Sequence, residues 1–119
     1  MKAKSNYFVF CRRHIVADED ENDVKWPWEG AGETVAVSRA QAINNVRYRN
    51  GLPSQHLPIE TSGHYDVWID WQALTLDEVE TIEKYHITVD DLLVSLEYVN
   101  KDLDTFFQEV NHGRRKNHI

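Results

Sequence analysis

The stretch YDVWIDWQALTLDE, residues 65–78, changes its periodicity partway along and so decides much of the fold. Over residues 65–74 apolar and polar side chains alternate, which predicts a strand with one solvated face. Thr75 and Glu78 then have capping-box spacing, which predicts that a helix opens here and ends near His86. The predicted apolar face of the strand consists of Tyr65, Val67, Ile69, Trp71 and Ala73.

The last third of the chain carries apolar residues at alternating spacings of three and four. This spacing predicts one long amphipathic helix over 89–112, capped by Thr88 and about 35 Å long. Its apolar stripe has two interpretations, because it can cover the sheet of its own chain or pair with a second copy as a homodimer. The predicted dimer seam consists of Leu92, Leu96, Val99, Leu103, Phe106 and Val110.

The first half predicts two strands and one helix. Residues 7–16 are rich in aromatic and β-branched side chains and predict a strand, whereas 18–32 predict a long loop. Residues 33–37 predict a second strand, and Ser38 and Gly51 are good caps for a helix over 39–50. Residues 52–63 predict an irregular connection.

Together these elements predict an α+β domain with a small, about three-stranded sheet packed by helices. The expected order is strand, strand, helix, strand, helix, helix. We expect a single domain over 1–112 and a flexible, polar, basic tail over 113–119.

Composition restricts the classes of function. The chain has 119 residues, of which 41% are hydrophobic, and a formal net charge of −7. The negative charge disfavours a general nucleic-acid coat. We expect a cytoplasmic protein, because there is neither an apolar run long enough for a transmembrane helix nor a signal peptide, and the lone Cys11 cannot form an internal disulfide.

Catalytic and metal chemistry find little support in the sequence. Asp66 and Asp70 share a strand face, but their backbones are about 13 Å apart, so salt bridges to Arg12 or to a neighbouring strand are preferred over a glycosidase pair. Cys11 and His14 fall on opposite faces of their strand. We therefore expect no enzyme, no metal and no cofactor. The least implausible catalytic site would set His64 and Asp66 against Cys11, and a zinc site would have to gather the scattered His56, His64, His86 and His112.

Tryptophan is the residue type that most suggests recognition. Trp26 and Trp28 flank a proline in the predicted loop, and Trp68 lies on the solvated strand face. Exposed tryptophan is a frequent anchor in protein interfaces. The competing interpretation makes Trp26 and Trp28 a lid over one end of the core.

The helix over 39–50 is the alternative site, because its polar face combines amides, an aromatic ring and arginines. Such side chains can contact bases and phosphates, or a partner protein, or form a plain surface. The predicted nucleic-acid contacts are Arg12, Arg13, Asn45, Arg47, Tyr48 and Arg49.

The sequence thus favours a small acidic interaction, regulatory or inhibitor domain that binds another protein and forms a homodimer. A nucleic-acid-binding accessory protein is the alternative.

Overall fold

The computed structural model describes residues 3–17, 24–51, 56–57 and 65–116. The chain divides into two compact units, Met1–Val79 and Glu80–Ile119, and each is described by itself. The predicted single domain over 1–112 stays a prediction. The structure confirms the α+β class and the predicted order of the main elements.

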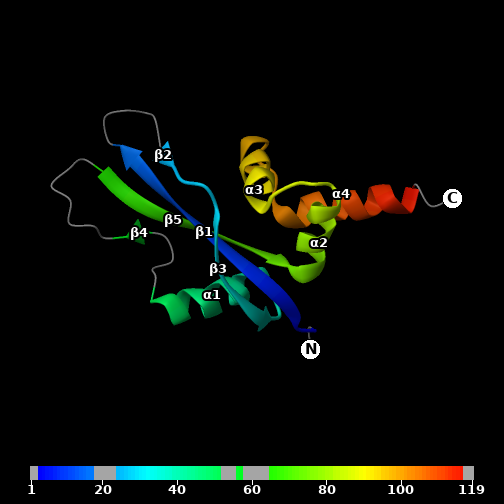
Figure 1. The fold of residues 1–119 in the computed structure, drawn as a ribbon, viewed down its shortest axis with the longest axis horizontal. Helices are drawn as coiled ribbons and strands as arrows, with labels where there is room; N and C mark the ends of the chain where they lie inside the picture. The colour runs from blue at the N-terminus through cyan, green and yellow to red at the C-terminus, as the bar shows by residue number, and fades with distance from the viewer. Residues whose placement is uncertain (1–2, 18–23, 52–55, 58–64, 117–119) are drawn as a thin grey trace. The chain divides into compact units, whose positions relative to one another are not determined.

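The first unit is built on an antiparallel sheet (Figure 1). The central strand β1 (Ser5–Ala17) pairs with β5 (Tyr65–Thr75) along one edge. Along its other edge β1 pairs with β3 (Glu29–Ala36) and with the two-residue strand β2 (Val24–Lys25). The two-residue strand β4 (His56–Leu57) pairs with β5.

Two of the short pairings correct the predicted loops. The loop predicted over 18–32 contains β2 and the first four residues of β3, and β4 falls within the connection predicted over 52–63. The hydrogen bonds of β1 explain the first correction, because a strand of 13 residues offers more edge than a short second strand can pair. Residues 18–23, 52–55 and 58–64 lie outside the described part of the chain.

Helix α1 (Arg39–Asn50) has the predicted bounds and the predicted caps. The Ser38 hydroxyl accepts a hydrogen bond from the Gln41 N–H at 3.1 Å, and Gly51 ends the helix at φ 62°, a left-handed conformation that favours glycine. The helix packs on one sheet face through Ala42 and Val46. Residues that share this core are Tyr7, Val9, Ala36 and Ala73, with Trp71 and Ile43 packed against them.

Side chains of α1 also bind carbonyl groups of two strands. Arg49 donates to the carbonyl of Glu33 and Asn50 to that of Ala31, both in β3. Arg39 donates to the carbonyl of Ala73 in β5 at 2.8 Å. The helix is therefore fixed to the sheet by polar as well as apolar contacts.

The second unit is helical. Helix α2 (Leu76–Lys84) begins in the first unit with the predicted capping box, since Glu78 N–H donates to Thr75 Oγ1 at 3.2 Å and Thr75 N–H to Glu78 Oε1 at 2.8 Å. Helices α3 (Val89–Tyr98) and α4 (Leu103–Lys116) follow. Buried apolar residues of this unit are Ile82, Leu92, Leu93, Leu96, Leu103 and Phe107.

The single long helix predicted over 89–112 is wrong, because the chain breaks after Tyr98. Asn100 takes a left-handed conformation at φ 55°, and Lys101 N–H donates to the Leu96 carbonyl at 2.9 Å, which closes α3. The Asp102 carboxylate then accepts from Thr105 N–H at 2.7 Å and opens α4. Helix α4 continues to Lys116, and residues 117–119 lie outside the described part, so the flexibility of the tail over 113–119 stays a prediction.

Candidate functional site

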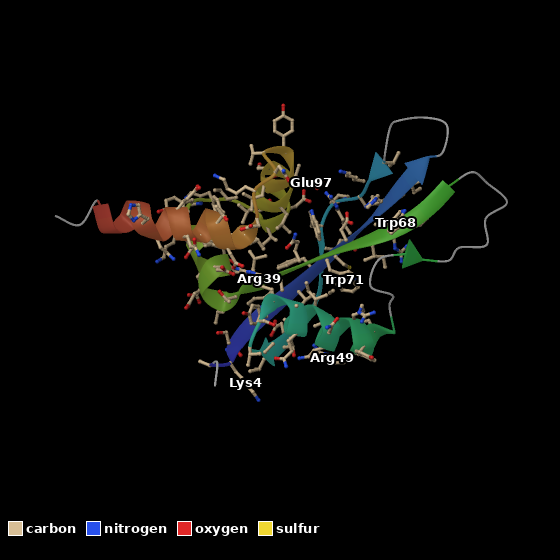
Figure 2. The ribbon with its side chains drawn as sticks, turned by 180° about the vertical axis from the view of Figure 1, so that it is seen from behind. Lys4, Arg39, Arg49, Trp68, Trp71 and Glu97 are labelled. Carbon is tan, nitrogen blue, oxygen red and sulfur yellow. The ribbon has the colours of Figure 1, made fainter. Side chains whose placement is uncertain are left out.

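The strand register assembles a polar and aromatic cluster on the sheet face opposite α1. Arg12 of β1 lies directly across from Asp70 of β5, and His14 lies across from Trp68. Directly opposed residues share a face, and this face is not the one that carries Val9 and Ala73 under α1. Figure 2 shows Trp68 and Trp71 on β5. Trp71 packs against the core as predicted.

A single carboxylate oxygen organises this cluster. Arg12 Nε donates to Asp70 Oδ2 at 2.9 Å, and His14 Nδ1 lies 2.8 Å from the same oxygen. The side chain of Arg12 is only 5% exposed. Of the salt bridges expected for Asp66 and Asp70, to Arg12 or to a neighbouring strand, the one between Asp70 and Arg12 is thereby confirmed.

Two indole rings flank the charged groups. The Arg12 Cζ lies 4.7 Å from the centroid of the Trp28 ring, which is a cation–π contact. The rings of His14 and Trp68 lie nearly parallel, with an interplanar angle of 10° and centroids 6.5 Å apart. The cluster therefore holds Trp28 against the sheet by packing and electrostatics.

Trp26 and Trp28 have different environments. Trp28 is buried, whereas Trp26 is 44% exposed and its neighbour Val24 is 56% exposed. The backbone leading to Trp26 is paired with β1, because Val24 and Lys25 lie in strand register with it and Trp26 N–H donates to the Arg13 carbonyl at 2.9 Å. Trp28 is thus buried against Arg12, while Trp26 presents an indole to solvent, and the choice between a lid and a recognition loop stays a prediction.

Helix α1 carries four of the predicted nucleic-acid contacts, and they differ in their environments. Tyr48 is 81% exposed, and the Arg47 guanidinium lies 5.6 Å from its ring centroid. Arg49 binds the Glu33 carbonyl and Asn45 Nδ2 donates to Thr34 Oγ1 at 3.3 Å.

Two further residues were predicted to join this surface. Arg13 is exposed on the sheet face that α1 covers, whereas Arg12 is buried on the opposite face. The expected placement of Arg12 beside the helix is therefore wrong, because the strand alternates its side chains.

The predicted dimer seam does not form one continuous stripe. Leu92 and Leu96 lie on α3, and Leu103, Phe106 and Val110 lie on α4. Leu92, Leu96 and Leu103 are buried in the chain, and Val99 lies between the helices and is 60% exposed. Self-association stays a prediction, which light scattering against the 14.0 kDa mass of one chain would measure.

The described residues do not form an arrangement that would support thiol catalysis or metal binding. Cys11 pairs in register with Glu29 and Trp71, on the face opposite His14, as predicted. Burial, and secondarily the charge of Glu29, raise the pKa of the Cys11 thiol, which disfavours a nucleophilic thiolate. His64 lies outside the described residues. Within the described part of the chain, no group of three or more metal-ligating side chains lies close enough to hold an ion.

Sequence analysis missed several exposed apolar residues. Val24 precedes Trp26, a predicted partner-binding residue, by two positions, and this proximity in the sequence was the signal available for Val24. Val94 and Tyr98 lie on α3 opposite its buried residues, and their spacing of four was the available signal.

No described helix has the length and apolar character needed to cross a membrane. Comparisons of the chain with protein-family models, with curated proteins and with solved structures give no match.

Proposed function

We propose that this chain is a non-enzymatic protein-interaction domain and that Trp26 is the main anchor for its partner. The observation that supports this proposal is an exposed indole on a backbone held by strand pairing on one side and by buried Trp28 on the other. Rigid aromatic anchors dominate binding energy in many interfaces.

Preorganisation is the physical advantage of this arrangement. Binding by a mobile loop would lose conformational entropy on association, at about 0.5–1.5 kcal/mol for each immobilised side chain. Here the contacts between Arg12, Asp70 and Trp28 already order the segment. Trp26 and Val24 can therefore bind with little further ordering.

Charge defines the kind of partner. Residues 18–23, directly before Val24 in the sequence, include five acidic residues, and the whole chain carries −7. A partner with an apolar pocket and a basic rim complements these features, and complementary charge accelerates association. A regulator, adaptor or inhibitor that occupies a basic groove on another protein fits this description.

Nucleic-acid binding through α1 is the second candidate. The observation that favours it is that α1 contains no acidic residue, while Arg47 and Tyr48 stack at its exposed surface. Such a surface can contact a base by stacking and a phosphate by charge.

A pull-down from the lysate of the native host separates these candidates. The tagged full chain is compared with Trp26→Ala and with the matched control Tyr48→Ala, each with and without nuclease. We expect a stoichiometric protein that survives nuclease, is lost with Trp26→Ala and is retained with Tyr48→Ala. Loss of all captured material after nuclease, or its loss in an Arg47→Ala/Arg49→Ala variant, would support the nucleic-acid candidate instead.

A further inference from the structure

The segment 26–28 joins two strands that pair with β1 in different registers. In β2, Lys25 lies opposite His14. In β3, Glu29 lies opposite Cys11. Three residues therefore link the two paired positions on this side, whereas only two residues of β1 link them on the other. The segment has one residue more than the strand it runs beside, which is the residue count of a β-bulge.

Pro27 is the extra residue. Trp26 N–H donates to the Arg13 carbonyl at 2.9 Å, which continues the β2 register by one residue. Continuing the β3 register by one residue places Trp28 opposite Arg12, in agreement with the cation–π contact between them. No residue of β1 remains to oppose Pro27. Proline has no N–H to donate to a neighbouring strand, so this position suits it.

The extra residue places the two indoles on opposite faces of the sheet. Arg12 and Arg13 are neighbours in β1, so their side chains point to opposite faces. Trp28 shares the face of Arg12 and is buried there. Trp26 shares the other face, which we call the Arg13 face, and is 44% exposed. In a regular strand residues 26 and 28 would share one face, because side chains alternate with a period of two.

A one-residue slip of β2 would reverse the placement of Trp26. If the β3 register extended through β2, Trp26 would lie opposite His14, and Lys25 would move to the Arg13 face. Side-chain burial favours this slip, because it would move an indole from solvent toward the rings of His14 and Trp68. A ladder of two paired residues offers little resistance to it. The observed register therefore needs a local cause.

Pro27 provides that cause. In the slipped register Pro27 would lie opposite Arg13, whose carbonyl now accepts the Trp26 N–H. Because proline has no N–H, the Arg13 carbonyl would lose its hydrogen bond in the slip. The contact of Trp28 with Arg12 is the same in both registers, so it cannot make this choice.

We propose that Pro27 is a positioning residue, which holds Trp26 on the Arg13 face by excluding the slipped register. The inference rests on the proposed function, in which Trp26 is the anchor for a partner. Pro27 acts through Trp26 and needs no contact with the partner.

Fluorine NMR of the full chain labelled with fluorotryptophan tests the placement of Trp26 without a partner. Its resonance is identified by its loss in Trp26→Phe, and the change in its shift between H2O and D2O reports exposure. Pro27→Ala restores an N–H and should split the Trp26 resonance or reduce its solvent isotope shift. The resonance of Trp71, which packs against the core, should stay unchanged and reports that the sheet is intact.

Deletion of Pro27 is the matched control. It removes the extra residue, so Trp26 stays opposite Arg13 and Trp28 stays opposite Arg12 in one continuous ladder. The deletion should therefore keep a single, exposed Trp26 resonance. A proline that merely stiffens the segment predicts the reverse order, with the deletion more disruptive than the substitution.

Two spectra would overturn the proposal. One is an unchanged solvent isotope shift of Trp26 in Pro27→Ala. The other is a deletion variant that buries Trp26 or loses the Trp71 resonance of the folded sheet.

Capture of the partner separates this inference from the proposed function. We expect Pro27→Ala to weaken capture and the deletion of Pro27 to retain it. If Trp26→Ala abolishes capture while Pro27→Ala leaves it unchanged, the inference alone is wrong. Full capture by Trp26→Ala would remove the anchor role, and the inference with it, even if the spectra change as expected.

Discussion

Arg39 and Glu78 form the ion pair whose loss should affect the stability of the first unit most clearly. The two guanidinium nitrogens Nη1 and Nη2 each donate to one carboxylate oxygen of Glu78, both at 2.6 Å. Nη1 also donates to the Ala73 carbonyl, and Glu78 Oε1 accepts from Thr75 N–H. The pair thus joins the start of α1 to the junction of β5 with α2 (Figure 2).

The expected magnitude follows from burial and bond number. The side chains of Arg39 and Glu78 are 21% and 14% exposed, so solvent screens their attraction only in part. A hydrogen bond to a charged group contributes about 1.5–3 kcal/mol, and a surviving partly buried charge adds a desolvation penalty. We expect Arg39→Ala to lower the free energy of unfolding by about 2–3 kcal/mol. Glu78→Ala should cost about 1 kcal/mol more, because it also removes the capping box.

Urea denaturation followed by tryptophan fluorescence is the appropriate assay, since all four tryptophans belong to the first unit. A double-mutant cycle with Arg39→Ala and Glu78→Ala should give a coupling energy of about 2 kcal/mol. Lys101→Ala is the control, followed by far-UV circular dichroism because it lies in the second unit; the Lys101–Glu109 pair is largely solvated and should contribute less than about 1 kcal/mol. A coupling energy below about 0.5 kcal/mol would refute the reasoning.

Four further predictions concern single positions. Gly51→Ala should lower the free energy of unfolding by about 1–2 kcal/mol in the same urea assay, because alanine is strained at a φ of 62°. No atom lies within 4 Å of the added Cβ, so backbone strain alone should account for the change. Gly30→Ala, which also meets no atom within 4 Å and lacks the positive φ, should change it by less than about 0.5 kcal/mol. Burial and, secondarily, Glu29 raise the pKa of the Cys11 thiol, so iodoacetamide should alkylate Cys11 more slowly at pH 8 than it alkylates glutathione. The alkylation rate should increase as the pH rises and in the Glu29→Gln variant. An alkylation rate equal to that of glutathione would contradict this prediction. Asp70→Asn should lower the free energy of unfolding by about 2 kcal/mol, because it removes the carboxylate that binds the buried Arg12 guanidinium. An unchanged midpoint of urea denaturation would show that this salt bridge does not contribute to stability.

Local signals in the sequence predicted local structure well. The alternation over 65–74 predicted β5, and Ser38, Gly51, Thr75 and Thr88 predicted helix ends that the structure confirms. These predictions succeeded because each depends on hydrogen bonds or side-chain faces within a few residues.

The break between α3 and α4 was missed because the apolar spacing outweighed a local signal. Val99 and Leu103 keep the helical spacing of apolar residues across the break, so this spacing predicted one helix through residues 99–102. The competing signal was an asparagine that tolerates a left-handed conformation, followed two residues later by a capping aspartate.

The candidate site was predicted only in part, because it depends on pairing between strands that are far apart in the sequence. Trp26 and Trp28 look alike in the sequence, and only the register of β1 decides that Arg12 binds Asp70 and packs on Trp28. Long-range pairing therefore separates the buried indole from the exposed one.

The hydrogen bonds from α1 to carbonyl groups of β3 affect whether a second molecule can extend the sheet. Among the described residues β3 pairs with β1 alone, so its other edge could accept a strand from a second molecule. Arg49 and Asn50 occupy carbonyls of β3, and an incoming strand would have to displace both side chains before it could form hydrogen bonds. These two hydrogen bonds therefore disfavour extension of the sheet by a second molecule along this edge of β3.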